Sequence, residues 1–188
     1  MGRYRKTSDD RIWKLGQQET RRCSQNFGRE IEKAKKEGIT NIFLNQSLTC
    51  LPNFLGCFPE DQINNLTINQ FPSFLIANID SHDMQGSHWL AIGIFKYSIE
   101  IFDPLGFKIF NWKRIPCGLL SFLHRMSVTR RVQVAQRVQP DNSHLCGPYC
   151  IFYLVLRSIT SLRTILSFFY LRYSKLHQND SILCSFFK

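Results

Sequence analysis

The sequence lacks several features that would place it in other classes of protein. It contains no Cys-x-x-Cys pair, which argues against a zinc ribbon or a thioredoxin-type redox site. Its longest apolar runs, such as 151–156, are far shorter than the roughly 18–20 residues that a membrane-spanning helix needs. The first residues, MGRYRKTSDDR, lead into no apolar segment, so we predict no signal peptide. Internal repeats and low-complexity segments are also missing.

Acidic residues are scarce relative to basic ones. The 188 residues include 24 Lys and Arg against 14 Asp and Glu, a net charge of +10. Such a surplus favours contact with polyanions, nucleic acid first and an anionic membrane second, although a basic surface can also serve solubility alone. Residues 1–38 hold 11 basic and 6 acidic residues, and residues 39–188 hold 13 and 8, so a fifth of the chain carries half of the surplus. We therefore predict a basic N-terminal arm or helix over 1–38.

The remaining residues, 39–188, have the composition of one globular domain. Apolar residues make up 44% of the whole chain, enough for a sizeable core. The seven cysteines are an odd number, and without a signal peptide we expect a reducing intracellular compartment in which thiols stay free.

The clearest secondary-structure pattern lies in the middle of the chain. Residues 88–95 (HWLAIGIF) form a continuous apolar run, 96–98 indicate a turn, and 99–103 (IEIFD) form a second apolar segment. This pattern predicts two antiparallel strands joined by a tight turn. His88 begins the first strand and Asp103 ends the second, so the hairpin brings these two side chains together at one edge of a sheet.

Other elements follow from hydrophobic periodicity and from turn residues. The segment 39–59 suggests irregular structure with a short helix or two. The remaining expectations are a helix over 29–36 ended by Gly38, a strand over 71–80, a helix over 119–126, a strand with a basic outer face over 128–138, a helix from 146 and an amphipathic helix over 161–173.

Cys146 opens an apolar segment, CGPYCIFYLVLRSI, that follows a polar loop. The segment predicts a buried helix, in whose first turn Pro148 is tolerated. A cysteine at the start of a helix faces unpaired N–H groups and the positive end of the helix dipole, which favour the nucleophilic thiolate. Gly147 would let a substrate backbone approach closely. A free cysteine is more often a buried structural residue, so this position alone leaves both interpretations open.

His88, Asp103 and Gln139 complete a possible catalytic set. Taken singly, they could be a surface histidine, an ordinary Asp-Pro turn and a polar loop residue. In the order His, Asp, Gln, Cys they match a cysteine protease, in which histidine is the general base and the acid fixes the imidazole tautomer. Gln139 lies seven residues before Cys146, where its amide can donate to an oxyanion alongside the Cys146 N–H.

Three segments, GSHWLAIGIF, EIFDPLGF and QPDNSHLCGPYC, resemble the adenovirus-type endopeptidase family, adenain, and its relatives in large DNA transposons of the Polinton/Maverick kind. In that family a Gly-x-His-Trp motif supplies the base, and the acidic residue that ends the next strand supplies the acid. A glutamine seven residues before the cysteine completes the oxyanion hole, and Cys-Gly-x-x-Cys opens the central helix. NFLGCF and FPSF also resemble the family's upstream segments, so the resemblance covers 54–156.

The resemblance implies an α+β cysteine-protease fold over 39–188, with a central mixed sheet flanked by helices and the nucleophile at the start of a buried helix. It implies His88, Asp103 and Cys146 as catalytic residues, with Gln139 in the oxyanion hole and no metal or other cofactor required for the chemistry. Adenain processes viral precursor proteins and is activated by viral DNA and a short viral peptide. The resemblance therefore implies a monomeric processing protease that contacts DNA in the host nucleus or the virion.

Two alternative functions remain open from the sequence. The SUMO-deconjugating proteases share the fold and the order of catalytic residues, but they usually place the glutamine one residue nearer the cysteine and an aspartate directly before it. Here Leu145 precedes Cys146, which favours the adenain type. An inactive, basic DNA-binding relative is the other alternative, although it would be expected to lose part of the constellation. Two positions mark this chain as a divergent member. Asp103 stands where adenain usually has Glu, and Pro148 stands where the family more often has Leu or Met.

Overall fold

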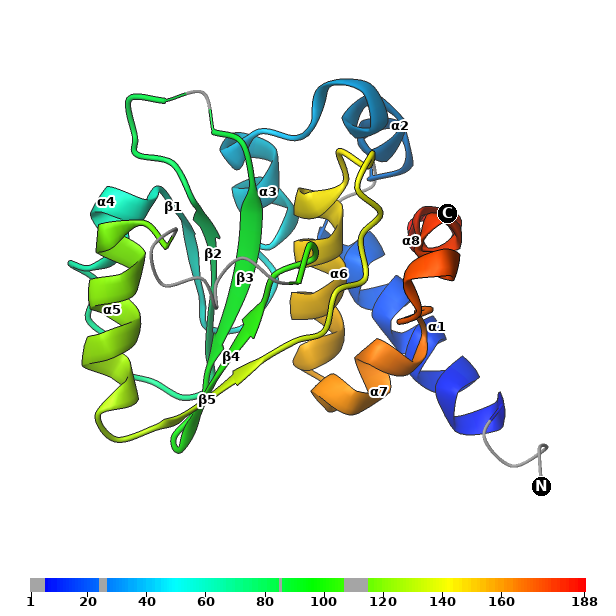
Figure 1. The fold of residues 1–188 in the computed structure, drawn as a ribbon. Coiled ribbons are helices and arrows are strands. Elements are labelled where there is room, and N and C mark those ends of the chain that lie inside the picture. The colour runs from blue at the N-terminus through cyan, green and yellow to red at the C-terminus, as the bar shows by residue number, and fades with distance from the viewer. Residues whose placement is uncertain (1–5, 24–26, 85, 107–114) are drawn as a thin grey trace.

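The computed structural model describes residues 6–23, 27–84, 86–106 and 115–188. In this part of the chain a five-stranded mixed sheet lies between two layers of helices (Figure 1). The strands, which lie side by side in chain order, are β1 (Phe54–Phe58), β2 (Ser73–Asn78), β3 (Trp89–Ile94), β4 (Ser98–Phe102) and β5 (Arg131–Val134). The three central strands pair antiparallel, whereas β1 and β5 pair parallel to β2 and β4. The predicted α+β class with a central mixed sheet is confirmed.

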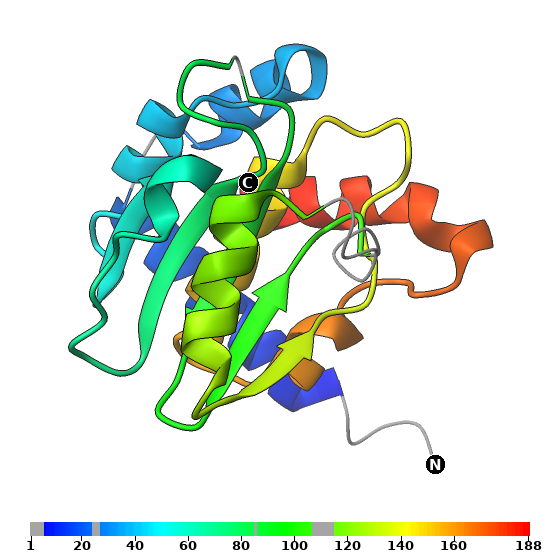
Figure 2. The same cartoon turned by 60° about the vertical axis from the view of Figure 1, so that its left-hand side comes forward.

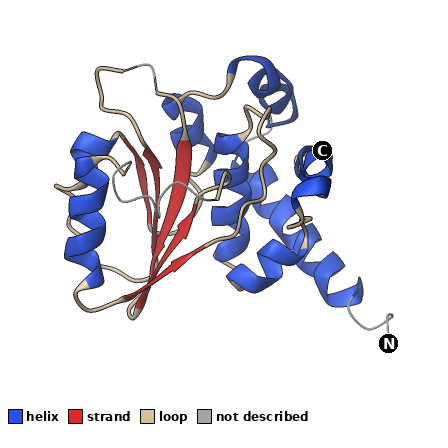
Figure 3. Cartoon of the chain, in the orientation of Figure 1, coloured by secondary structure: helices blue, strands red, loops and turns tan. Residues whose placement is uncertain are grey.

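Helices cover both faces of the sheet, as Figure 3 shows by colour. One face carries α4 (Glu60–Ile63) and α5 (Cys117–Ser127), and Figure 2 shows α5 lying in front of the sheet while α6 lies behind it. The other face carries α6 (Cys146–Arg157). The remaining helices are α1 (Lys6–Cys23), α2 (Phe27–Glu37), α3 (Asn41–Ser47), α7 (Leu162–Ser167), the 3-10 helix η3 (Tyr173–Gln178) and α8 (Asn179–Phe186).

The central strands are buried on both faces, which explains their continuous apolar sequence. Because successive side chains of a strand point to opposite faces, Phe74 and Ile76 of β2 join the core on the α6 side. Leu75 and Ala77 join the core on the α5 side. All six residues of β2 are buried.

Helix α6 has no exposed face over most of its length. Its first eleven residues are all buried, and only Arg157 at its end is partly exposed. The Arg157 guanidinium donates to both carboxylate oxygens of Glu100 in β4, at 2.7 Å from Nε and 2.9 Å from Nη2. Tyr153 donates to the same carboxylate at 2.9 Å. These bonds satisfy a charge that lies in an otherwise apolar strand.

The N-terminal helices pack onto this core. The ring of Trp13 in α1 lies edge-on to Phe152 of α6 and Phe186 of α8, with centroids 5.9 and 5.1 Å apart. Gly16 permits this close approach, since a Cβ there would collide with the side chain of Leu156. In α2 the buried residues are Phe27, Ile31 and Ala34. The division of the chain at residue 38 into an arm or helix and a protease domain stays a prediction.

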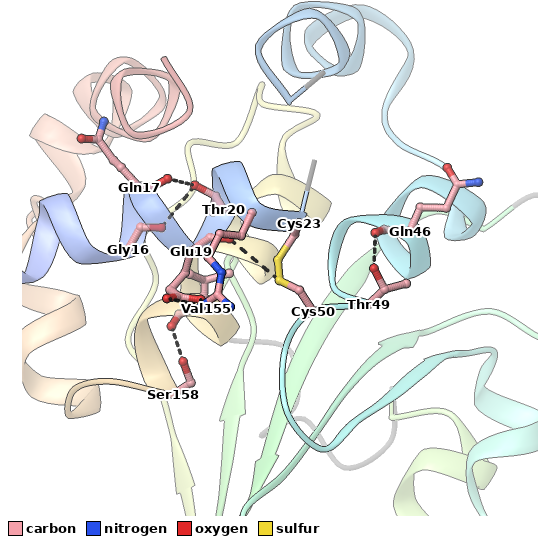
Figure 4. Close-up of a disulfide and its surroundings, with 11 residues drawn as sticks. Gly16, Gln17, Glu19, Thr20, Cys23, Gln46, Thr49, Cys50, Val155 and Ser158 are labelled. Atoms are coloured by element: carbon pink, nitrogen blue, oxygen red, sulfur yellow. Dashed lines mark hydrogen bonds and ion pairs between the residues drawn. A yellow bond between two sulfur atoms is a disulfide. The ribbon is translucent and has the colours of Figure 1, made fainter. Parts of the chain in front are cut away.

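A disulfide joins Cys23, the last residue of α1, to Cys50 in the turn after α3 (Figure 4). The Cα atoms of the two cysteines lie 5.3 Å apart, a separation that a disulfide spans. We expected free thiols throughout, and the structure differs at this pair because the packing of α1 beside α3 brings the two cysteines together. Among the described residues the free cysteines are Cys57, Cys117, Cys146, Cys150 and Cys184.

Most predicted elements are confirmed. The helices expected over 29–36 and 119–126 and from 146 correspond to α2, α5 and α6, and the strands of the hairpin correspond to β3 and β4. Gly38 ends α2 with a positive φ of 75°, and its N–H donates to the Ala34 carbonyl at 3.0 Å. The strand expected over 71–80 is present as the shorter β2.

Three predictions about the remaining elements are confirmed only in part. The segment 39–59 was expected to be irregular with a short helix or two: α3 is such a helix, but Phe54–Phe58 form strand β1, in which Gly56 has a φ of 128° at a bulge in the pairing with β2. The helix expected over 161–173 ends at Ser167, because Asn179 accepts a hydrogen bond from the Tyr170 N–H at 2.8 Å. The strand expected over 128–138 is confirmed only for Arg131–Val134.

No helix in the described ranges is both long enough and apolar enough to cross a membrane.

We predict that Trp13→Ala lowers the free energy of unfolding by about 3 kcal/mol, the lower end of the range for a buried aromatic residue, because the ring is only partly buried. Urea denaturation followed by circular dichroism measures the change. Tyr97→Ala is the control, since Tyr97 is 71% exposed and should change stability by less than about 0.5 kcal/mol. Equal stability of wild type and Trp13→Ala would show that α1 contributes nothing to the core.

Candidate active site

A cleft with a cavity volume of about 760 Å³ opens at the end of the sheet where β3 and α6 begin. Its walls come from α2, from the α2–α3 connection, from the loop before β3 and from the loop before α6. His88, Gln139 and Cys146 all line this cleft. Asp103 lies behind His88 and is only 3% exposed.

The hairpin brings His88 and Asp103 together as predicted. In the register of β3 and β4, Ala91 lies opposite Phe102, so the residue before β3 and the residue after β4 meet at the same edge. The distance between His88 Nε2 and Asp103 Oδ1 is 2.7 Å. The Leu105 N–H donates to the same oxygen at 2.9 Å. Because Nε2 carries the proton that this carboxylate accepts, Nδ1 is the ring nitrogen left for a second partner.

That second partner of the imidazole is Cys146. Burial by itself lowers the pKa of His88, but hydrogen bonds and charge interactions with Asp103 and Cys146 outweigh burial and raise the pKa to about 9. The imidazole is therefore protonated at neutral pH, between a carboxylate on one side and the cysteine sulfur on the other. The ring thus lies between the group that orients it and the sulfur of the candidate nucleophile.

Cys146 is the first residue of α6. The residue before it, Leu145, makes no side-chain hydrogen bond to the helix end, so no capping side chain competes for the N–H groups of the first turn. Cys146 is 8% exposed and reaches the cleft, while Cys150 one turn later is wholly buried. The helix dipole thus favours a negative charge at the sulfur that faces His88.

Gly147 has a different role from the one that its sequence context suggested. A Cβ at Gly147 would collide with the side chain of Ile39, so the glycine makes room for the α2–α3 connection and not for a substrate backbone. Trp89 fixes the same connection, because its indole Nε1–H donates to the Ile39 carbonyl at 3.1 Å. The residues beside His88 and beside Cys146 therefore hold one wall of the cleft.

Gln139 is buried at the base of the cleft. Its backbone N–H donates to the Pro104 carbonyl at 2.8 Å, which attaches the glutamine to the strand end that carries Asp103. Its side-chain Nε2 donates to the Ser143 carbonyl at 2.7 Å. Among the described residues, Oε1 of this amide is buried without a hydrogen-bond partner. One of the two N–H groups on Nε2 is left over to donate to a bound group.

The four predicted site residues therefore lie in one cleft or directly behind its wall, but the catalytic spacing does not indicate the side chains that support them. Ser143 and Asp180 connect the loop of Gln139 to α8, and no motif or spacing marks either residue. Among the described residues no group of three or more His, Cys, Asp and Glu side chains is arranged to hold a metal ion.

Comparison with known proteins gives consistent results. A family model described as adenovirus endoprotease matches residues 54–165. The protease of Bovine adenovirus 2 is 32% identical over 119 residues, which are 55% of this chain and 54% of that protein. The protease of Bovine adenovirus B serotype 3 is 30% identical over 132 residues, 60% and 59% of the two chains. This chain thus spans somewhat more than half the length of these relatives.

Among solved structures, the ASFV pS273R protease matches 82% of this chain and 70% of its own, with 19% identity and a TM-score of 0.46, too low to carry an argument. The family model is the stronger result, because it covers 112 of the 188 residues (165 − 54 + 1). The matched segment includes His88, Asp103, Gln139 and Cys146. The chain belongs to the adenovirus endoprotease family.

Proposed function

We propose that the protein is a cysteine endopeptidase that processes precursor proteins of a virus or of a DNA transposon. One observation carries the proposal: His88 lies between the Asp103 carboxylate, at 2.7 Å, and the Cys146 sulfur, in the cleft of a member of an endoprotease family. Leu145, which stands where deconjugating enzymes have an aspartate, supports precursor processing over removal of a ubiquitin-like protein.

In the proposed mechanism the Cys146 thiolate attacks the scissile carbonyl and a tetrahedral intermediate forms. The backbone N–H of Cys146 and the free N–H of the Gln139 amide donate to its oxyanion. The His88 imidazolium then gives its Nδ1 proton to the leaving amine, and the acyl group stays on the sulfur.

Deacylation uses the same groups in reverse roles. Neutral His88 accepts a proton from a water molecule, which attacks the thioester carbonyl. The C–S bond then breaks, Cys146 leaves as the thiolate beside protonated His88, and the new carboxyl end of the peptide is released. Asp103 holds the ring in one tautomer and stabilises its positive charge in both half-reactions. Every proton transfer in this scheme uses side chains of the cleft, so the chemistry requires no metal.

We also propose that the protein acts as a monomer on DNA in the host nucleus or the virion, with DNA and a viral peptide as activators. The net charge of +10 supports the DNA contact. One surface that suits it is the end of the sheet opposite the cleft. There Lys96 lies over the exposed ring of Tyr97 and Arg130 over the ring of Phe71. The backbone N–H of Arg131 donates to the Tyr97 carbonyl, which places a third basic residue beside them. Cations beside exposed rings suit phosphates and bases. We call these five residues the basic–aromatic patch.

Cys146→Ala should abolish peptide cleavage, because the nucleophile is lost, with a fall in rate of at least about 10⁴-fold. A library of proteome-derived peptides, analysed by mass spectrometry after incubation with each protein, provides the substrates and the measurement. Cys117→Ala is the matched control, since Cys117 is an exposed free cysteine outside the cleft and should cleave like wild type.

Retained cleavage by Cys146→Ala would disprove the proposed nucleophile. Labelling of Cys146 by a SUMO C-terminal probe, in a wild type that cleaves no library peptide, would favour the deconjugating function instead.

Asp103→Asn should move the alkaline limb of the pH–rate profile to lower pH. In wild type the rate should fall as pH rises through about 9, where His88 loses the proton that it gives to the leaving amine. Removal of the Asp103 charge removes a cause of the raised pKa, so the limb should move down by about one to three units.

The pH dependence of kcat/KM, and an NMR titration of the His88 ring, measure this shift. Asp61→Asn is the control: Asp61 contacts His82 at the rim of the cleft and should leave the limb where it is. An unchanged limb in Asp103→Asn would rule out the carboxylate as the partner of His88.

The affinity of the protein for double-stranded DNA should fall at least about tenfold between 50 and 200 mM salt, because bound phosphates release counterions. Lys96→Gln combined with Arg131→Gln should weaken binding and flatten this salt dependence. Fluorescence anisotropy with a labelled duplex measures both.

Arg29→Gln combined with Lys36→Gln, on the exposed face of α2, removes the same charge and serves as the control. A larger effect of the α2 variant would place the DNA contact elsewhere, and salt-independent binding by the wild type would contradict a phosphate contact altogether.

A further inference from the structure

Helix α8 contacts the loop that carries Gln139. We call residues 138–145 the oxyanion loop. The Asp180 carboxylate, in the first turn of α8, accepts a hydrogen bond from Ser143 Oγ at 3.1 Å and one from Tyr149 Oη at 2.9 Å, both on Oδ1. Ser143 belongs to the oxyanion loop and Tyr149 to the first turn of α6. One carboxylate oxygen therefore links the oxyanion loop to the helix that carries the nucleophile.

Ser143 passes this contact on to Gln139. Its carbonyl accepts the Nε2–H of Gln139 at 2.7 Å, and its Oγ accepts the Leu145 N–H at 3.2 Å. A side-chain amide can turn by 180° and exchange its oxygen with its nitrogen. The Ser143 carbonyl excludes the turned form, because two acceptor oxygens would then face each other. The position of Ser143 thus determines which end of the Gln139 amide faces the cleft.

The neighbouring residue of α8 holds the other end of the oxyanion loop. Asn179 is fully buried, and its Nδ2 donates to the Val138 carbonyl at 2.7 Å and to the Tyr170 carbonyl at 2.8 Å.

Burial raises the pKa of Asp180, and the hydrogen bonds from Tyr149 and Ser143 offset only part of this effect. Because burial takes the Asp180 carboxylate away from water, the hydrogen bonds from Tyr149 and Ser143 are needed to stabilise its charge. Helix α8 lies outside residues 54–165, which the family model matches.

We propose that Asp180 is a positioning residue of the endopeptidase, which acts through Ser143 to keep the Gln139 amide turned with its N–H towards the oxyanion. The inference rests on the proposed function of the cleft. Asp180 does not line the cleft that would hold the substrate and lies outside the catalytic pair, Cys146 and His88, so its effect should appear only in the step that uses the oxyanion hole.

The first test compares Asp180→Ala with Asp180→Asn, using a library peptide that the wild type cleaves. Asp180→Ala should lower kcat about tenfold and leave KM unchanged, whereas loss of the amide itself in Gln139→Ala should cost about 10²–10³-fold. Asp180→Asn keeps an oxygen that accepts from Ser143 and should restore most of kcat. The rate of Cys146 alkylation by iodoacetamide, which uses the catalytic pair but no oxyanion hole, should be the same in all of these variants.

The second test combines the two changes. In the Gln139→Ala background, Asp180→Ala should cause no further loss of kcat, because the amide that Asp180 positions is already absent. A general structural role would lower kcat by the same factor in both backgrounds and would slow alkylation as well. Glu19→Ala controls for the lost charge, since Glu19 forms only a surface ion pair with Arg22.

Thermal unfolding shows which variants are folded. If Asp180→Ala is unfolded, Ser143→Ala replaces it, since it removes the hydroxyl that donates to Asp180 and accepts the Leu145 N–H, and keeps the carbonyl that holds Gln139. Wild-type kcat in Asp180→Ala or its substitute, or equal losses in the two backgrounds, would overturn the positioning role while leaving the endopeptidase intact. A wild type that cleaves no peptide would instead contradict the proposed function.

Discussion

Helix α6 is enclosed by protein along eleven of its twelve residues, so every element around it must bring apolar surface to it. Sheet residues such as Phe102 stack on it from one side, with a centroid distance of 4.6 Å to Tyr153. Trp13 and Phe186 enclose it from the other side. Such a helix has one position relative to the sheet, and the position of its first residue is fixed with it. The enclosure of α6 thus determines where the Cys146 sulfur lies relative to the edge of the sheet that carries His88.

The contact between His88 and Asp103 could be predicted from the sequence because the geometry that creates it is local. A tight turn between two strands fixes their register, and the register alone brings His88 next to Asp103. The start of α6 was equally visible, since a polar loop gives way to a long apolar segment at Cys146. Gln139 was found by its spacing from Cys146, as the family resemblance implies, and the structure places it at the same cleft.

The parts that could not be predicted depend on contacts between distant segments. Asp180 lies 34 residues after Cys146, and nothing in its neighbourhood shows that it accepts hydrogen bonds from Ser143 and Tyr149. Strand β1 contains a glycine whose bulge only the pairing with β2 explains. The helix expected over 161–173 has good periodicity, but Asn179 captures the Tyr170 backbone and ends it early. In each case a tertiary hydrogen bond or strand pairing overrides the local pattern.

The contact of Gly147 with Ile39 restricts the order in which this cleft can change during evolution. Any side chain at position 147 would require that residue 39 become smaller first, because both cannot occupy the same volume. The backbone carbonyl of residue 39 in turn accepts the indole N–H of Trp89, the neighbour of His88. Substitutions at positions 147 and 39 are therefore epistatic: a relative with a side chain at position 147 should carry a residue smaller than isoleucine at position 39.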